Sequence, residues 1–224
     1  MHSHMSSDNK TALKPRKLPR QARSQATVDA IFDATIQVLL ADGLQRLTTI
    51  RVAERAGVSI GTLYQYFPHK QALLFAVLER HLGRVGDVLQ QAAESVHGES
   101  LATMVSTVVE AFVRAKTARI DEARALYAVA AELDVRELAQ GAERRSRATL
   151  VAMLATASDA IFDDLNTTAF MLAAAMVGPT RLMVEGGAPR AMLRALPRQL
   201  ESLCLGYLER EARPRARLKR TGAS

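Results

Sequence analysis

The sequence predicts an all-α protein with a small N-terminal helical domain followed by a larger helical domain. Hydrophobic residues form 48% of the chain, yet aromatic residues form only 4% and Trp is absent, a composition that favours helices over strands. Apolar residues recur at steps of three and four positions, which is the period of one helix face. No segment alternates between apolar and polar residues as a half-buried strand would.

The expected helices follow in order along the chain. The first begins near Ser24, carries its apolar stripe from Val28 to Leu40, and ends at Gly43, which can take a left-handed conformation. Two short helices follow between about Thr48 and Phe67. The later helices are expected at about 69–96, 100–117, 121–134, 136–160, 165–186 and 189–211.

Basic residues gather at the two ends of the chain, whose net charge is +7. Residues 1–80 carry 11 Lys and Arg against 6 Asp and Glu, and residues 209–224 carry 6 against 2, whereas the middle carries 13 against 15. This distribution suggests that a polyanion is met at an end, with basic tails that only aid solubility as the alternative. The expected segments are a basic disordered arm over 1–20, a helical domain over 21–80, a larger one over 81–211 and a basic disordered tail over 212–224.

The cellular compartment is expected to be the cytoplasm. Cys204 is the only cysteine, so no internal disulfide forms, which suits a reducing compartment. The opening Met-His-Ser-His-Met lacks the apolar core of a signal peptide. The longest nearly unbroken apolar run, 169–178, is about half the ~20 residues that a membrane-spanning helix needs, so no membrane contact is expected.

The segment from Leu47 to Leu74 carries the most specific pattern. Thr48 or Thr49 is a suitable N-cap for a short helix, and Ala56-Gly57-Val58 supplies a small residue, a positive-φ position and an apolar plug for a tight turn. Ser59 caps a second helix that turns Leu63 inward. Two short helices joined by such a turn form a helix-turn-helix, whose second helix enters the major groove of DNA. The residues expected outward are Ile60, Gly61, Thr62, Tyr64, Gln65 and Tyr66.

The run Val52-Ala53 … Ala56-Gly57-Val58-Ser59 … Gly61-Thr62-Leu63-Tyr64 … Tyr66-Phe67 … Lys70 … Leu73-Leu74 resembles the signature of TetR-type transcriptional regulators. The resemblance is close over residues 24–80 and extends only to general layout beyond them. It implies a homodimeric repressor that binds a pseudo-palindromic operator and is released by a small-molecule effector. It also implies that Thr49, Tyr64 and Lys70 hold phosphates and that Ser59 to Thr62, Gln65 and Tyr66 form the recognition surface.

The chemistry of these residues leaves alternatives for several of them. Gln favours adenine and Thr can contact a thymine methyl, whereas Ile60 could contact a methyl or pack internally. Lys70 could instead be a solvated lysine, and the arm of residues 1–20 could follow the DNA backbone or remain free. Two positions depart from the family pattern: apolar Ile50, and His69, which is expected to cap the long helix weakly. The predicted DNA-binding residues are Thr48, Thr49, Ser59, Ile60, Gly61, Thr62, Tyr64, Gln65, Tyr66 and Lys70.

The larger domain is expected to hold a partly apolar effector and the dimer interface. Flexible Met and aromatic side chains commonly line adaptable sites, although ordinary core packing is the alternative; Glu110, Arg114 and Arg124 could orient a polar ligand group or face solvent. The candidate effector residues are Met104, Phe112, Tyr127, Met153 and Met176. The candidate dimer residues are Ala174, Gly178, Leu193, Leu196, Leu200, Leu203 and Tyr207, so Leu200→Glu is expected to give monomers; packing within one chain is the alternative.

An enzyme is not expected, because no His, Cys, Asp and Glu cluster has metal-ligand spacing and no nucleophile elbow or phosphate-binding glycine loop is present. Neither a cofactor nor a metal is expected. Two alternatives to an effector-controlled repressor remain. One is a DNA-binding regulator without a small ligand, architectural or controlled by a protein, and the other is an activator.

Overall fold

The computed structural model describes residues 22–215, so the basic arm of residues 1–20 and the last nine residues of the tail lie outside the described part. The described chain is helical apart from one pair of two-residue strands, which confirms the all-α prediction. It divides into two compact units. We call them the N-terminal unit, which holds the described residues up to Leu82 together with Ile120–Leu138, and the C-terminal unit, which holds Gly83–Arg119 and the described residues from Ala139 onward.

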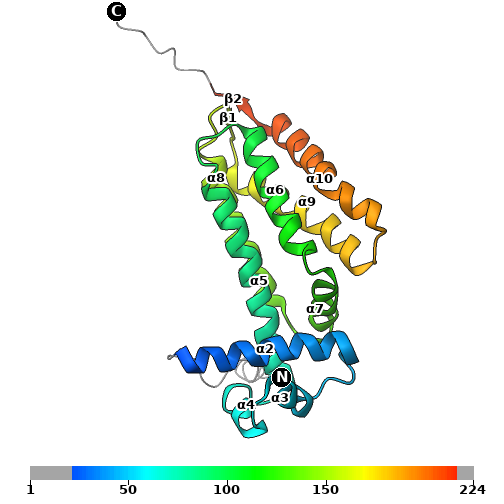
Figure 1. Ribbon diagram of the computed structural model, residues 1–224. Coiled ribbons are helices and arrows are strands. Elements are labelled where there is room, and N and C mark those ends of the chain that lie inside the picture. Colours follow the sequence, from blue (N-terminus) through cyan, green and yellow to red (C-terminus); the bar gives the residue numbers. More distant parts are fainter. Residues whose placement is uncertain (1–21, 216–224) are drawn as a thin grey trace, which may run out of the picture. The chain divides into compact units, whose positions relative to one another are not determined.

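The N-terminal unit is built around one apolar core. Its helices are α2 (Ala22–Asp42), α3 (Thr49–Ala56), α4 (Ile60–Tyr66), the first part of α5 (Lys70–Glu94) and α7 (Ile120–Glu132). In Figure 1, α2 lies beside α3, and α4 follows α3 after a short turn. The sequence places α7 in the larger domain, but Leu126 and Val129 are buried in this N-terminal core instead.

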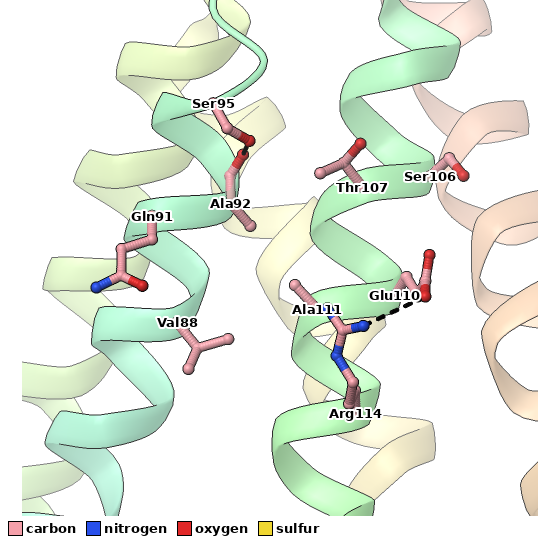
Figure 2. Close-up of a pocket in the computed structure, with 9 residues that line it drawn as sticks. All are labelled: Val88, Gln91, Ala92, Ser95, Ser106, Thr107, Glu110, Ala111 and Arg114. Carbon is pink, nitrogen blue, oxygen red and sulfur yellow. Dashed lines mark hydrogen bonds and ion pairs between the residues drawn. The ribbon is translucent and has the colours of Figure 1, made fainter.

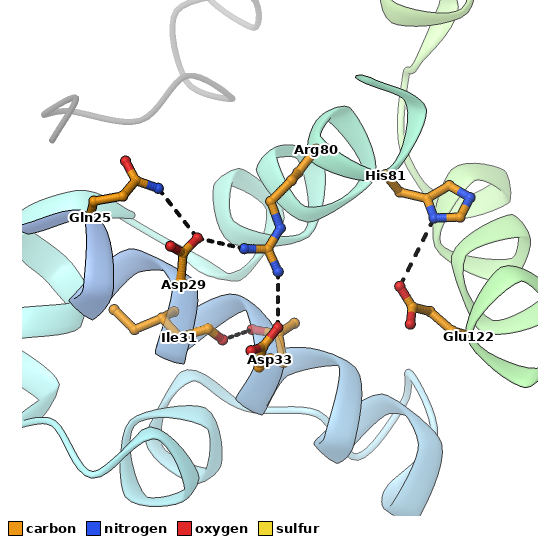
Figure 3. Close-up of polar contacts among 8 residues, drawn as sticks. Gln25, Asp29, Ile31, Asp33, Arg80, His81 and Glu122 are labelled. Carbon is orange, nitrogen blue, oxygen red and sulfur yellow. Dashed lines mark hydrogen bonds and ion pairs between the residues drawn. The ribbon is translucent and has the colours of Figure 1, made fainter. Parts of the chain in front are cut away.

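Polar contacts fix α5 to α2 and α7 within the N-terminal unit (Figure 3). The Arg80 guanidinium donates to Asp29 at 2.8 Å and to Asp33 at 3.0 Å, and lies 4.4 Å from the centre of the Phe32 ring. On α7 the buried Glu122 faces His81 of α5, with 4.0 Å between Oε1 and Nδ1. Because Arg80 joins two carboxylates on successive turns of α2 and stacks on a ring between them, it holds the angle between the two helices.

The C-terminal unit packs α6 (Leu101–Thr117), α8 (Arg136–Leu154), α9 (Leu165–Glu185) and α10 (Arg190–Glu211) with the second part of α5. The helices α6, α9 and α10 contact one another and lie side by side in Figure 1. Its core includes Cys204, which is fully buried, and burial raises the pKa of this thiol to about 11. The thiol is therefore a packing group, as a cysteine on an apolar helix stripe is expected to be.

The helix α9 is long and apolar enough to cross a membrane by length and composition. Its Leu172, Ala173 and Met176 are nevertheless buried in the core of the C-terminal unit. Its last turn also carries an ion pair between Arg181 and Glu185 at 2.9 Å. The helix therefore reads as a core helix of this unit, whose outer side is itself apolar.

Two expectations at the C-terminal end are wrong. The helix predicted over 136–160 ends at Leu154, after which Ala160–Ile161 forms strand β1. This strand pairs antiparallel with β2 (Arg213–Pro214), so the start of the predicted disordered tail is held in place. Arg213 forms an ion pair with Asp163, and the Arg215 guanidinium donates to the carbonyl of Ala157. A pairing of two residues at such separation leaves no periodic signal in the sequence.

Candidate nucleic-acid interface

The first helix of the helix-turn-helix, α3, has a hydrogen-bonded cap at each end. Thr48 is the N-cap, because its Oγ1 accepts from the amide of Arg51 at 3.3 Å. Gly57 ends the helix with a φ of 67°, and the amide of Val58 then donates to the carbonyl of Ala53 at 3.0 Å. A left-handed residue at this point satisfies the last carbonyls and turns the chain sharply. The sequence prediction of a capped helix and a glycine turn is confirmed.

The second helix, α4, begins at a serine cap. Ser59 Oγ accepts from the amide of Thr62 at 3.0 Å and lies 2.8 Å from Thr62 Oγ1. Leu63 is fully buried and fixes the inner side of this helix. The opposite side exposes Ile60, Gly61, Tyr64 and Gln65, while Thr62 is half-buried at its edge.

Tyr66 corrects the prediction for the outward face. The prediction placed its side chain outward, whereas only 7% of the residue is exposed and its ring lies 6.3 Å from the ring of Phe67. Tyr66 follows Leu63 by three positions, which places both on the same side of a helix. That spacing was present in the sequence, and it removes Tyr66 from the residues that could contact DNA directly.

Gly61 lies at the centre of the outward face of α4. Its backbone is not left-handed, and a Cβ added to it would meet only Ser59 Oγ, at 3.7 Å, which is an ordinary contact. Glycine inside a helix is less favourable than alanine by roughly 0.5–1 kcal/mol. The packing of this chain therefore gives no reason for a glycine at this position.

The residues that match phosphate ligands make contacts within the chain. Thr49 Oγ1 lies 3.0 Å from Tyr64 Oη, which links α3 to α4, and Thr49 is buried. Lys70 Nζ donates to the carbonyl of Leu44 at 2.8 Å, so this lysine is not simply solvated. An ammonium group has three protons, and this bond uses one of them. These contacts hold Tyr64 in a fixed position on the recognition helix and Lys70 in a fixed position at the start of α5.

His69 caps the long helix α5, the position at which a weak cap is expected from the sequence. Its Nδ1 accepts from the amide of Ala72 at 3.1 Å, the position that a Ser or Asn oxygen would serve. A histidine nitrogen that accepts a hydrogen bond carries no proton of its own. The cap lies directly between α4 and Lys70, and it fixes where α5 begins.

The C-terminal unit contains a groove between α5 and α6, with a volume of about 410 Å³ (Figure 2). None of the five predicted effector residues lines it: Met104, Phe112, Met153 and Met176 are buried in the core of the C-terminal unit, and Tyr127 belongs to the N-terminal unit. Glu110 and Arg114 do line the groove, and they form an ion pair with 3.5 Å between Oε1 and Nη1. Its lining residues are Val88, Gln91, Ala92, Ser95, Ser106, Thr107, Glu110, Ala111 and Arg114.

The outer side of α9 and α10 is apolar. Of eleven exposed large hydrophobic residues in the described chain, six lie on these two helices, so this side is an unusually apolar part of the surface. They are Phe170, Met171, Val177, Leu182, Met192 and Leu203.

The predicted dimer residues divide between this outer side and the core. Leu203 is 53% exposed and Ala174 is exposed, whereas Gly178, Leu193 and Tyr207 are half-buried. Leu196 and Leu200 are 1% and 2% exposed and pack in the core of their own chain, so both predictions are wrong. The inward-facing stripe has a step of four, 196–200–204–208, and Leu203 lies at its edge, where the side chain is exposed.

These features define a helix-turn-helix DNA-binding protein with a separate helical unit. Residues 31–77 match the family model described as bacterial regulatory proteins, tetR family, and residues 100–208 match the one described as tetracyclin repressor-like, C-terminal domain. The chain belongs to the TetR family of transcriptional regulators. The proteins of this family are DNA-binding transcriptional regulators and not enzymes.

Individual relatives match only part of the chain. The transcriptional repressor KstR of Mycolicibacterium smegmatis is 41% identical over 63 residues, which are 28% of this chain and 31% of that protein. The nucleoid occlusion factor SlmA of Actinobacillus pleuropneumoniae is 38% identical over 71 residues, 31% of this chain and 33% of that protein. The chain therefore matches about a third of the length of these curated relatives.

A solved structure shares the whole fold. The TetR transcription regulator of Haloarcula marismortui superimposes with a TM-score of 0.69 at 17% identity, covering 84% of this chain and all of that one. At this identity the likeness concerns the fold alone.

Proposed function

We propose that this protein is a cytoplasmic transcriptional repressor that binds a pseudo-palindromic DNA operator as a homodimer and leaves it when a small molecule binds. The observation that carries the proposal is the outward face of α4, where Ile60, Gly61, Tyr64 and Gln65 are exposed on a helix capped at Ser59. A recognition helix presents its side chains to base edges from such a face. Gly61 supports the proposal, because a surface without a side chain allows close approach of DNA.

The dimer would form through the apolar outer side of α9 and α10. Two copies related by a two-fold axis would bury the same residues from each side, including Val177 and Leu203. The two α4 helices must then lie about 34–36 Å apart to enter successive major grooves. KstR, the similar protein from Mycolicibacterium smegmatis, is a repressor, which supports repression over activation.

The effector would occupy the groove between α5 and α6. Its volume lies in the range of small-molecule sites, and its lining combines apolar Val88 and Ala111 with polar Gln91 and Thr107. This lining fits a ligand with several hydrogen-bonding groups on a partly apolar frame. A ligand releases DNA only if it binds the released conformation more tightly than the DNA-bound one.

The test begins with DNA selected from the genome by the full-length protein. Binding of labelled operator is measured by fluorescence anisotropy, and compounds that raise the melting temperature are tested for release. The variant Ser106→Trp, which fills the groove, should abolish release but not operator binding, while Ala102→Trp on an exposed part of α6 should change neither. Failure to enrich any palindromic sequence would contradict the proposal.

A second candidate is a DNA-binding regulator that takes no small ligand. Two observations favour it: Met104, Met153 and Met176 are packed in the core, and 71 residues of the chain are similar to a nucleoid occlusion factor. Under this candidate the protein binds its operator, but no compound in the screen releases it through the groove.

A further inference from the structure

The hydroxyl groups of Ser59, Thr62 and Tyr64 are paired with one another or with α3. Ser59 Oγ and Thr62 Oγ1 are 2.8 Å apart, and Tyr64 Oη is 3.0 Å from Thr49 Oγ1. Gln65 is exposed, and its amide forms no hydrogen bond with any residue of 22–215. Gln65 is thus the side chain of α4 whose full hydrogen-bonding capacity remains available for a base edge.

The helix α4, Ile-Gly-Thr-Leu-Tyr-Gln-Tyr, contains no charged side chain and no Asn or His. Arg and Lys make the commonest direct contact to guanine, at O6 and N7, and Asp or Glu accepts from the amino group of cytosine. Arg51 of α3 is held by Asp42 at 2.8 Å. The recognition helix therefore lacks the groups that usually identify a G·C pair.

The groups that α4 does offer fit an A·T pair. The amide of Gln65 can donate to adenine N7 and accept from adenine N6, and the thymine methyl is the apolar group of the major-groove edge. Ile60 is 37% exposed, so part of its side chain is open to solvent and can contact such a methyl. Ile60 and Gln65 are five residues apart, about 7.5 Å along the helix axis, so they would contact different base pairs.

We infer that the base pairs read by α4 are A·T pairs, identified by the Gln65 amide on adenine and by a thymine methyl against Ile60. The inference rests on the proposed function, since it names the chemistry of the operator that the function requires. Gly61 lies between these two residues in the sequence. Because it has no side chain, the helix can approach the groove closely enough for both side chains to reach the bases.

The experiment uses the full-length protein and duplexes selected from a random pool. The selection is repeated with Gln65→Ala. The base-pair positions at which this variant loses its preference for one base are the positions that Gln65 contacts. Each thymine of the half-site is then replaced by uracil, which removes only the methyl group, and the adenine at the Gln65 position is replaced by 7-deazaadenine, which removes N7.

We expect one uracil to weaken binding by about fourfold, the effect of one buried methyl group, and 7-deazaadenine to weaken it by roughly fivefold, the effect of one hydrogen bond. In Ile60→Ala the difference between thymine and uracil should vanish. The control variant Ile50→Ala removes an exposed isoleucine from α3 and should keep that difference.

The outcomes separate the inference from the function on which it rests. Two results overturn the inference and leave the repressor proposal intact. In one, the selected motif is palindromic but Gln65→Ala loses its preference at a G·C pair; in the other, no replacement of thymine by uracil changes the affinity. A pool that yields no preferred sequence overturns both.

Discussion

Gly61→Ala should make the free protein more stable and at the same time weaken its binding to DNA. The free protein gains because alanine is favoured over glycine within a helix by roughly 0.5–1 kcal/mol, and the new methyl meets only Ser59 Oγ, at 3.7 Å. For a chain of this size such a gain raises the melting temperature by about 1–4 °C. The bound state loses because the methyl must fit into a contact that the glycine leaves open.

The loss can be estimated from packed interiors, where one extra methylene group costs about 1–3 kcal/mol. The affinity of each subunit for its half-site should therefore fall by about 5- to 150-fold. Thermal unfolding without DNA and anisotropy titrations with operator measure the two effects separately. Gly141→Ala is the matched control, because Gly141 lies in α8 with nothing within 4 Å of an added Cβ; it should raise stability and leave DNA binding unchanged. Wild-type affinity in Gly61→Ala, or a lower melting temperature, would refute the reasoning.

Three further outcomes are expected. Leu203→Glu should give folded monomers with weak operator binding in sedimentation experiments, whereas Leu40→Glu, at an exposed leucine on α2, should remain dimeric; a dimeric Leu203→Glu would place the interface elsewhere. Unfolded Cys204 loses its proton near pH 9 and the buried thiol only near pH 11, so wild-type stability should fall between these values. The free energy of unfolding, measured by chemical denaturation, should decrease by at most about 2–3 kcal/mol over this range. Cys204→Ala should lack this decrease, and an equal decrease in both proteins would contradict burial of the thiol. His69→Ala removes the cap of α5 and should cost about 1 kcal/mol of stability, which His69→Asn should restore; an unchanged His69→Ala would mean that the cap contributes nothing.

The local features of the helix-turn-helix could be predicted from the sequence because they depend on neighbouring residues. The caps at Thr48 and Ser59 and the left-handed Gly57 are each set by a few adjacent positions. The same short range explains the Tyr66 error, since its spacing from Leu63 already indicated the inner side. The Lys70 contact could not be predicted, because its partner Leu44 is 26 positions away.

The larger unit was less predictable because its helices are apolar on more than one side. Leu200 and Leu203 lie on the same helix and have the same chemistry, yet one is in the core and the other on the surface. Only the packing of α10 against α6 and α9 distinguishes them. The assignment of α7 to the N-terminal unit is likewise a tertiary fact, set by the burial of Leu126 and Val129.

The pairing of β1 with β2 limits how the protein can be shortened or fused. Arg213 and Arg215 hold the loop between α8 and α9 through their contacts with Asp163 and Ala157. In the same loop, the Asp159 carboxylate accepts a hydrogen bond from the amide of Leu101 at 2.9 Å. A truncation after Glu211 would leave these groups without partners at one end of three helices. A reporter fused beyond residue 215 would spare them, so tags for the binding assays belong there.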